Sequence, residues 1–200
     1  AEYYQQGYET YADFEVYFGN AANMMSSADI AKVLQMITDA YGELSPAQEA
    51  VITTGLSGCG KFSYSMAAHT NCGKGVAGGA TDCSGYMSWI HNNCGLYSNT
   101  SLCNTTTTWS LAAGYKANDV SSLKPGDLIV KGAPGAKSAS EGNSNHVVMF
   151  IGILTDPDTG QTSPWIIECG GSAGGSGVHG NANKIYSYKT AVPLGSSDTW

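Results

Sequence analysis

The chain has 200 residues, which suffices for one globular domain with an N-terminal extension but hardly for two full domains. Its formal net charge of −7, with only 9 Lys and Arg, argues against nucleic acid as a partner, and no apolar run is as long as a membrane span. Charged residues make up only 12% of a chain rich in Gly, Ser, Thr, Asn and Tyr, which favours a secreted protein that meets carbohydrate-containing polymers.

The N-terminal part is predicted to be helical. Residues 1–20 carry aromatic side chains at helical spacing, which we interpret as one face that packs on the domain rather than as a sugar-binding stripe: Tyr4, Tyr8, Tyr11, Phe14 and Phe18. From Ser27 to Tyr41 apolar residues recur at i, i+3, i+4 and i+7, and Gly42 ends that helix. We therefore expect a helical extension over residues 1–44 and the main domain over residues 45–200.

The main domain is predicted to begin with helices and to continue with strands. Ser45, Pro46 and Gln48 form a helix-start pattern, and this helix should run to about Ser57. After a Gly-rich loop over 58–81, helices are expected over 83–92 and 104–113, and strands near 127–131, 146–154, 163–169 and 184–188. Residues 156–160 are interpreted as a hairpin turn rather than a calcium loop. Helices first and antiparallel strands later indicate an α+β fold.

Two distant segments carry the candidate chemistry. Cys83 opens a helix among small neighbours, and His146 heads an apolar strand. The thiolate is the nucleophilic form of cysteine, and both a helix N-terminus and a nearby imidazolium favour it. A cysteine paired in space with a distant histidine is typical of a thiol hydrolase.

Three ordered motifs resemble the NlpC/P60 cysteine peptidases. Asp82 to Tyr86 resembles the nucleophile motif, Leu123 to Ile129 the "PGDL" turn and strand, and His146 to Gly152 the histidine strand. The similarity covers roughly residues 45–190. It implies a papain-like core, with N-terminal helices packed on an antiparallel sheet, in which Cys83 is the nucleophile and His146 the base.

The third catalytic position departs from the commonest family pattern. Where relatives usually carry a polar residue, most often His, this chain offers Glu168, which also resembles the related CHAP amidases and endopeptidases. A carboxylate can accept the imidazole N–H and stabilise the imidazolium. His179 is the alternative, but its Gly-rich surroundings predict a mobile loop. The resemblance further implies that Tyr64, together with the neighbours of the nucleophile Asp82 and Ser84, binds substrate.

The remaining cysteines leave alternatives open. Pairing Cys94 with Cys103 and Cys59 with Cys72 would staple both sides of the nucleophile helix and leave Cys83 and Cys169 free, but connectivity cannot be deduced from spacing. Buried free thiols are the other interpretation. His69 with Cys59 and Cys72 matches no zinc-ligand spacing, so no metal or other cofactor is expected.

The resemblance implies a monomeric extracellular or cell-wall-associated hydrolase of peptidoglycan stem peptides. The expected reaction cleaves the D-γ-glutamyl bond to the diamino acid through Cys83, His146 and Glu168. An N-acetylmuramoyl-L-alanine amidase or cross-bridge endopeptidase of CHAP type is the alternative with the same chemistry. A catalytically weak wall-binding module, which uses the aromatic N-terminal helix, is the alternative of another class.

Overall fold

The computed structural model describes residues 17–18, 24–68, 76, 79–96, 120–131, 146–170, 177–181 and 190–192. It confirms the α+β prediction. A six-stranded sheet has the order β1-β7-β6-β5-β4-β8, and β2 and β3 form a separate parallel pair. The strands are β1 (Tyr17–Phe18), β2 (Ser63–Tyr64), β3 (Ala80–Thr81), β4 (Leu128–Lys131), β5 (His146–Thr155), β6 (Thr162–Gly170), β7 (Gly177–Asn181) and β8 (Thr190–Val192).

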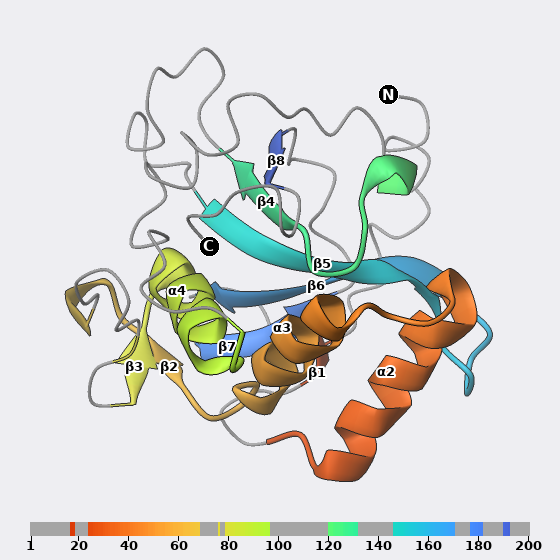
Figure 1. Cartoon of the computed structure of the whole chain (residues 1–200). Helices are drawn as coiled ribbons and strands as arrows, with labels where there is room; N and C mark the ends of the chain where they lie inside the picture. The colour runs from red at the N-terminus through yellow and green to blue at the C-terminus, as the bar shows by residue number, and fades with distance from the viewer. Residues whose placement is uncertain are drawn as a thin grey trace.

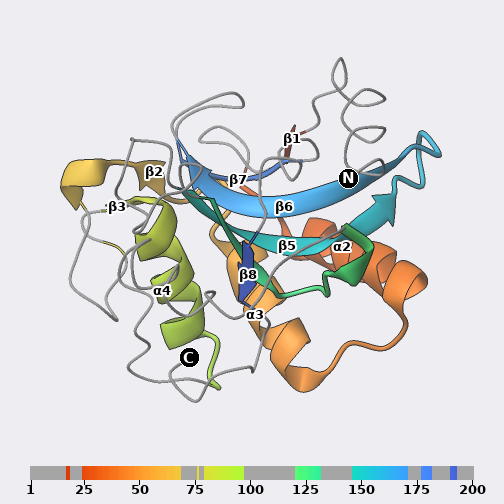
Figure 2. The same cartoon turned by 90° about the horizontal axis from the view of Figure 1, so that it is seen from above.

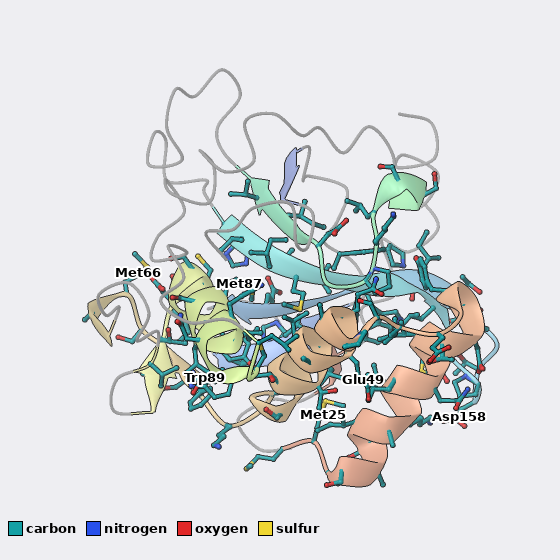
Figure 3. All side chains as sticks on the ribbon, viewed as in Figure 1. Met25, Glu49, Met66, Met87, Trp89 and Asp158 are labelled. Atoms are coloured by element: carbon teal, nitrogen blue, oxygen red, sulfur yellow. The ribbon has the colours of Figure 1, made fainter. Side chains whose placement is uncertain are left out.

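Three helices cover one face of the sheet: α2 (Ser27–Tyr41), α3 (Pro46–Ser57) and α4 (Cys83–Asn93). They lie in a row along the sheet in Figure 1, and the view from above in Figure 2 shows α4 beside the β2–β3 pair. Short 3₁₀ turns occupy Met66–Ala68 and Val120–Ser122. Val33 of α2, Ile52 of α3 and Met87 of α4 belong to the same buried cluster, so all three helices share one core with the sheet (Figure 3).

The helix starts follow the capping patterns in the sequence. Ser26 and Asp29 form a reciprocal capping box at α2, and Ser45 and Gln48 form one at α3 with Pro46 in the first turn. Each box satisfies two backbone N–H groups that would otherwise lack partners at a helix start. The predicted bounds of both helices are confirmed for this reason. Gly42, at φ +81°, ends α2 as expected.

The Lys124–Asp127 turn fixes where the central sheet begins. The Asp127 carboxylate accepts the backbone N–H of Lys124 at 2.9 Å, and the Lys124 carbonyl accepts the N–H of Asp127 at 3.0 Å. Gly126, at φ +96°, donates to the Phe150 carbonyl at 2.8 Å. The turn therefore sets the register in which β4 pairs antiparallel with β5, with Lys131 opposite His146.

β5 and β6 form the long central hairpin. Their connection is the predicted turn, in which Asp156 N donates to Gln161 O at 2.8 Å and Gly160 adopts φ +72°. The register shifts between Phe150 and Gly152. Beyond that bulge, Met149 lies opposite Ile167, and both side chains are buried in the core.

The structure corrects several expectations at the sheet edges. Residues 177–181 form β7 rather than a mobile loop, and Tyr17–Phe18 form β1 opposite Asn181 and Gly180, so the predicted N-terminal helix does not reach Phe18. The predicted helix over 104–113, the strand near 184–188 and residues 1–16 lie outside the described residues.

The cysteine prediction is corrected in part. Cys83 and Cys169 are free thiols as expected, but Cys59 and Cys94 are free as well, so neither predicted bridge is present at these two residues. Their proposed partners, Cys72 and Cys103, lie outside the described residues. Within the part of the chain that the structure describes, no helix is long and apolar enough to cross a membrane.

Candidate active site

The start of α4 holds Cys83 at the end of the sheet. Asp82 is the N-cap and accepts the backbone N–H of Gly85 at 2.8 Å, so the helix begins at the cysteine. One turn later the Tyr86 hydroxyl donates to the Gly55 carbonyl of α3, and its ring stacks on Trp89 at 5.5 Å between centroids. These contacts fix α4 and leave the Cys83 residue 8% exposed.

His146 is the first residue of β5 and lies between the nucleophile candidate and a carboxylate. Its Nε2 donates to Glu168 Oε2 at 2.7 Å, and its side chain is also hydrogen-bonded to that of Cys83. The His146 side chain keeps 23% of its surface exposed, whereas Glu168 keeps 1%. The histidine therefore lies at the border between core and solvent.

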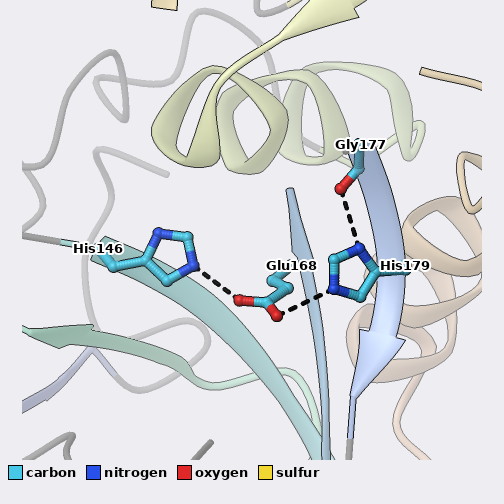
Figure 4. A network of polar contacts seen from close by, with 4 residues as sticks. All are labelled: His146, Glu168, Gly177 and His179. Carbon is cyan, nitrogen blue, oxygen red and sulfur yellow. Dashed lines mark hydrogen bonds and ion pairs between the residues drawn. The ribbon is translucent and has the colours of Figure 1, made fainter. Parts of the chain in front are cut away.

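Glu168 is held by histidines on both sides (Figure 4). Its Oε1 lies 3.0 Å from His179 Nε2, and His179 Nδ1 lies 3.0 Å from the Gly177 carbonyl oxygen. Ile167 packs towards Gly55 of α3, so the alternation along β6 turns Glu168 to the opposite face. A Cβ added at the neighbouring Gly170 would be in ordinary van der Waals contact with Glu168 Oε2, at 3.6 Å, so this glycine lies beside the Glu168–His146 contact.

The electrostatics of the site favour a charged imidazole. Burial works against the protonated form of His146, but its hydrogen bonds to Cys83 and Glu168 and their negative charges outweigh it and raise its pKa from the ordinary 6.5 to about 9. An imidazolium next to a cysteine favours the thiolate. The arrangement can therefore supply a nucleophile and a proton donor together.

A second histidine on α4 behaves in the opposite way. His91 is fully buried, its Nδ1–H donates to the Met87 carbonyl at 2.8 Å, and burial lowers its pKa from 6.5 to about 4. His91 is therefore a structural residue of the core and does not face solvent.

The three predicted substrate-binding residues surround Cys83 but differ in exposure. Tyr64 pairs with Thr81 in the β2–β3 register, and burial together with the negative charges of Cys83 and Asp82 raises its pKa. Asp82 is 4% exposed and caps the helix, and Ser84 is 2% exposed. Tyr64 is thus partly accessible beside the nucleophile, while substrate contact by Asp82 or Ser84 stays a prediction.

The site can perform acyl transfer with protein groups. The backbone N–H of Cys83 at the helix start can donate to the oxyanion of a tetrahedral intermediate. Among the described residues, no group of three or more His, Cys, Asp or Glu is arranged to hold a metal ion.

His179 is the site residue that the sequence reasoning misplaced. The one local signal in its favour was Val178, an apolar residue between Gly177 and His179 that is now buried in the core. A single apolar residue among glycines does not establish the period of a strand.

Residues 47–193 match the family described as bacteriophage peptidoglycan hydrolase. No curated protein matches the chain. The match spans well over half of the chain and includes Cys83, His146, Glu168 and His179. The chain therefore belongs to this family of phage peptidoglycan hydrolases.

Proposed function

We propose that this phage-type peptidoglycan hydrolase is a thiol enzyme, which cleaves an amide bond in the peptide part of peptidoglycan with Cys83, His146 and Glu168. The observation that carries the proposal is the His146 ring, hydrogen-bonded to the Cys83 side chain and, at 2.7 Å, to Glu168. The resemblance of the motifs to the NlpC/P60 peptidases supports the same roles. The enzyme would act as a monomer at the cell wall, outside the membrane.

In the first step the Cys83 thiolate attacks the carbonyl carbon of the scissile amide. The negative charge moves to the carbonyl oxygen, where the Cys83 backbone N–H donates to it. The intermediate collapses as His146 gives its proton to the leaving amine. A thioester on Cys83 and a free amine result.

In the second step a water molecule hydrolyses the thioester. His146, now neutral, takes a proton from the water, whose oxygen attacks the carbonyl carbon, and the thiolate of Cys83 leaves with the imidazolium restored. Glu168 keeps the ring oriented through Nε2–H and stabilises its positive charge in both steps. The products are a carboxylic acid and the unchanged enzyme.

The first candidate bond is the D-γ-glutamyl bond to the diamino acid of the stem peptide. In the relatives that the sequence resembles, this choice depends on a pocket for the free ammonium group of L-Ala, with roles here for Tyr64, Asp82 and Ser84. Tyr64 is available beside Cys83, partly exposed. The charge of Asp82 would attract the ammonium, although its Oδ1 is engaged by Gly85 N–H.

A second candidate is an N-acetylmuramoyl-L-alanine amidase or cross-bridge endopeptidase of CHAP type. Two observations favour it. The third position is a carboxylate, Glu168, as in that group, and both Asp82 and Ser84 are buried, at 4% and 2% exposure, which weakens the ammonium pocket. The chemistry at Cys83 is the same in either case.

Mass spectrometry of digested sacculi separates the candidates. Sacculi treated with the enzyme and then with a muramidase should yield disaccharide-linked L-Ala-D-Glu if the D-γ-glutamyl bond is cleaved. Glycan without peptide, together with free intact stems, would identify the amidase. The matched control is the Cys83→Ala protein, and release of either product by that variant would contradict the thiol mechanism.

A further inference from the structure

A buried histidine that the proposed reaction does not use lies on the far side of Glu168. His179 is 1% exposed and stands directly opposite Glu168 in the β6–β7 register. Its two ring nitrogens have different partners, Glu168 Oε1 and the Gly177 carbonyl oxygen, each at 3.0 Å (Figure 4). These two contacts determine which ring nitrogens of His179 carry protons.

The partners of His179 demand two ring protons. A carbonyl oxygen only accepts hydrogen bonds, so Nδ1 carries a proton. An ionised carboxylate also only accepts, so Nε2 carries one too whenever Glu168 is charged. A neutral imidazole has a single N–H. The Glu168–His179 pair therefore holds one proton more than an ionised carboxylate and a neutral imidazole would hold together.

That proton belongs on the imidazole rather than on the carboxylate. An imidazole ordinarily binds a proton more tightly than a carboxylate does. Glu168 also accepts from His146 through its other oxygen, and a hydrogen bond from a cation favours the charged carboxylate. A buried carboxylate is costly unless it is paired. If Cys83 is a thiolate and both histidines are protonated, negative and positive charges alternate from Cys83 through His146 and Glu168 to His179. The four charges then sum to zero.

We propose that His179 is a positively charged positioning residue, which holds the ionised Glu168 carboxylate in the orientation that His146 needs. The arrangement then has four members, Cys83–His146–Glu168–His179, of which the last acts only through Glu168. This inference rests on the proposed function, because the proposed function is what makes Glu168 the partner of the catalytic base His146.

The backbone around His179 is fixed well enough for this role. Val178 N donates to the Phe62 carbonyl at 3.0 Å, and Val178 O accepts from Gly60 N at 2.9 Å. Gly177 adopts φ +141°, and a Cβ there would overlap the Phe62 carbonyl oxygen. β7 is thus held by β6 on one side and by residues 60–62 on the other, so the imidazole has little freedom to leave Glu168.

The charge can be tested without activity. In ¹⁵N-histidine-labelled Cys83→Ala protein near neutral pH, both ring nitrogens of His179 should appear protonated in NMR spectra. The resonances are assigned by their loss in His179→Gln. In the Cys83→Ala/Glu168→Gln protein, Nε2 should lose its proton, since the neutral amide no longer favours the cation. An unprotonated Nε2 opposite an intact Glu168 would overturn the proposal.

The positioning role is tested by kinetics in the active enzyme. His179→Leu, which removes both ring donors, should lower kcat about tenfold or more with KM unchanged, as loss of an outer hydrogen-bond partner commonly does. His179→Gln should recover most of that loss, because its amide N–H can still donate to Glu168. Circular dichroism confirms that both variants are folded. Wild-type kcat in His179→Leu, or equal impairment of both variants, would overturn the role. Activity that survived Cys83→Ala would instead overturn the proposed function, so the two failures are distinguishable.

Discussion

The two ends of α4 place histidines in opposite electrostatic states. At the last turn, His91 is fully buried, and burial lowers its pKa to about 4. Near the first turn, β5 brings His146 to Cys83, and its pKa rises to about 9 although burial opposes this. Both rings are removed from most of the solvent, so burial alone does not decide the charge.

The difference lies in the hydrogen-bond partners. His91 Nδ1 donates to a carbonyl oxygen of its own helix, which has no net charge to stabilise the imidazolium. His146 contacts two groups that can be anionic, Cys83 and Glu168. Anionic partners, Cys83 first and Glu168 second, therefore decide that the imidazole at this border between core and solvent favours its charged form.

The largest loss of activity is expected when the candidate nucleophile is removed. Cys83→Ala should abolish hydrolysis while the fold persists, and His146→Ala should lose nearly as much, because the members of such a unit act together, at a cost on the order of 10⁶ in kcat. Release of soluble fragments from sacculi measures the effect. Cys94→Ala, which changes a free thiol at the other end of the same helix, is the matched control and should remain active. Wall hydrolysis by Cys83→Ala at even a tenth of the wild-type rate would refute the assignment.

Removing the carboxylate should take from His146 one of its two partners that can be anionic and leave Cys83. Glu168→Ala should reduce kcat strongly, since an orienting carboxylate of a triad is worth up to ~10⁴ in rate. Glu168→Gln should retain more activity, because its amide oxygen still accepts the imidazole N–H. Near-native rates in both variants would show that another group orients His146.

The pH dependence of activity reports the pKa of His146 directly. The imidazolium protonates the leaving amine, so kcat/KM should fall as pH rises through about 9, the raised pKa of His146. In Glu168→Gln this alkaline limb should move to lower pH, towards the ordinary 6.5. A limb at the same pH in both proteins would show that Glu168 does not support the charge.

The smallest expected effect is on stability, where the two histidines act with opposite sign. The stabilisation from His146 is full below pH 6.5 and is lost as pH rises through about 9, because its pKa is raised in the folded state. His91, whose pKa is lowered, costs stability as pH falls from 6.5 towards 4. His91→Leu should reduce the loss of stability towards acid pH, measured by urea unfolding between pH 6.5 and 4, and should leave kcat within about twofold of wild type, since the residue lies in the core away from Cys83 and His146. An unchanged acid-side slope would count against a neutral buried His91.

Local chemistry explains why so much of the fold could be predicted. Ser26, Ser45 and Asp82 are capping residues, so the starts of α2, α3 and α4 depend on side chains within one turn. The turns at Lys124–Asp127 and Asp156–Gly160 are equally local. Cys83 follows one of these caps, and His146 and Glu168 lie on strands that the sequence predicts, so the sequence alone places all three candidate residues on regular elements.

The features that the sequence did not predict, β7, the position of His179 and the free Cys59 thiol, depend on contacts between distant segments. β7 has two glycines around one buried apolar residue and exists because β6 and residues 60–62 pair with it. His179 could therefore not be placed beside Glu168 from its own neighbourhood. Cysteine spacing likewise did not reveal that Cys59 is a buried free thiol whose Sγ lies 3.8 Å from the Gly55 carbonyl oxygen.

The tight approach of Gly177 to Phe62 has a consequence for recognising other enzymes of this kind. Since a Cβ at this position would overlap the Phe62 carbonyl oxygen, a chain that keeps a histidine beside the glutamate in this way needs glycine two positions before that histidine. The result is a sequence motif, a glutamate in one strand followed by G-x-H in the next, formed here by Glu168, Gly177 and His179. A homologue with any other residue in place of that glycine could place the histidine only by moving β7 away from residues 60–62. The signature can be searched in translated phage genomes without any structure.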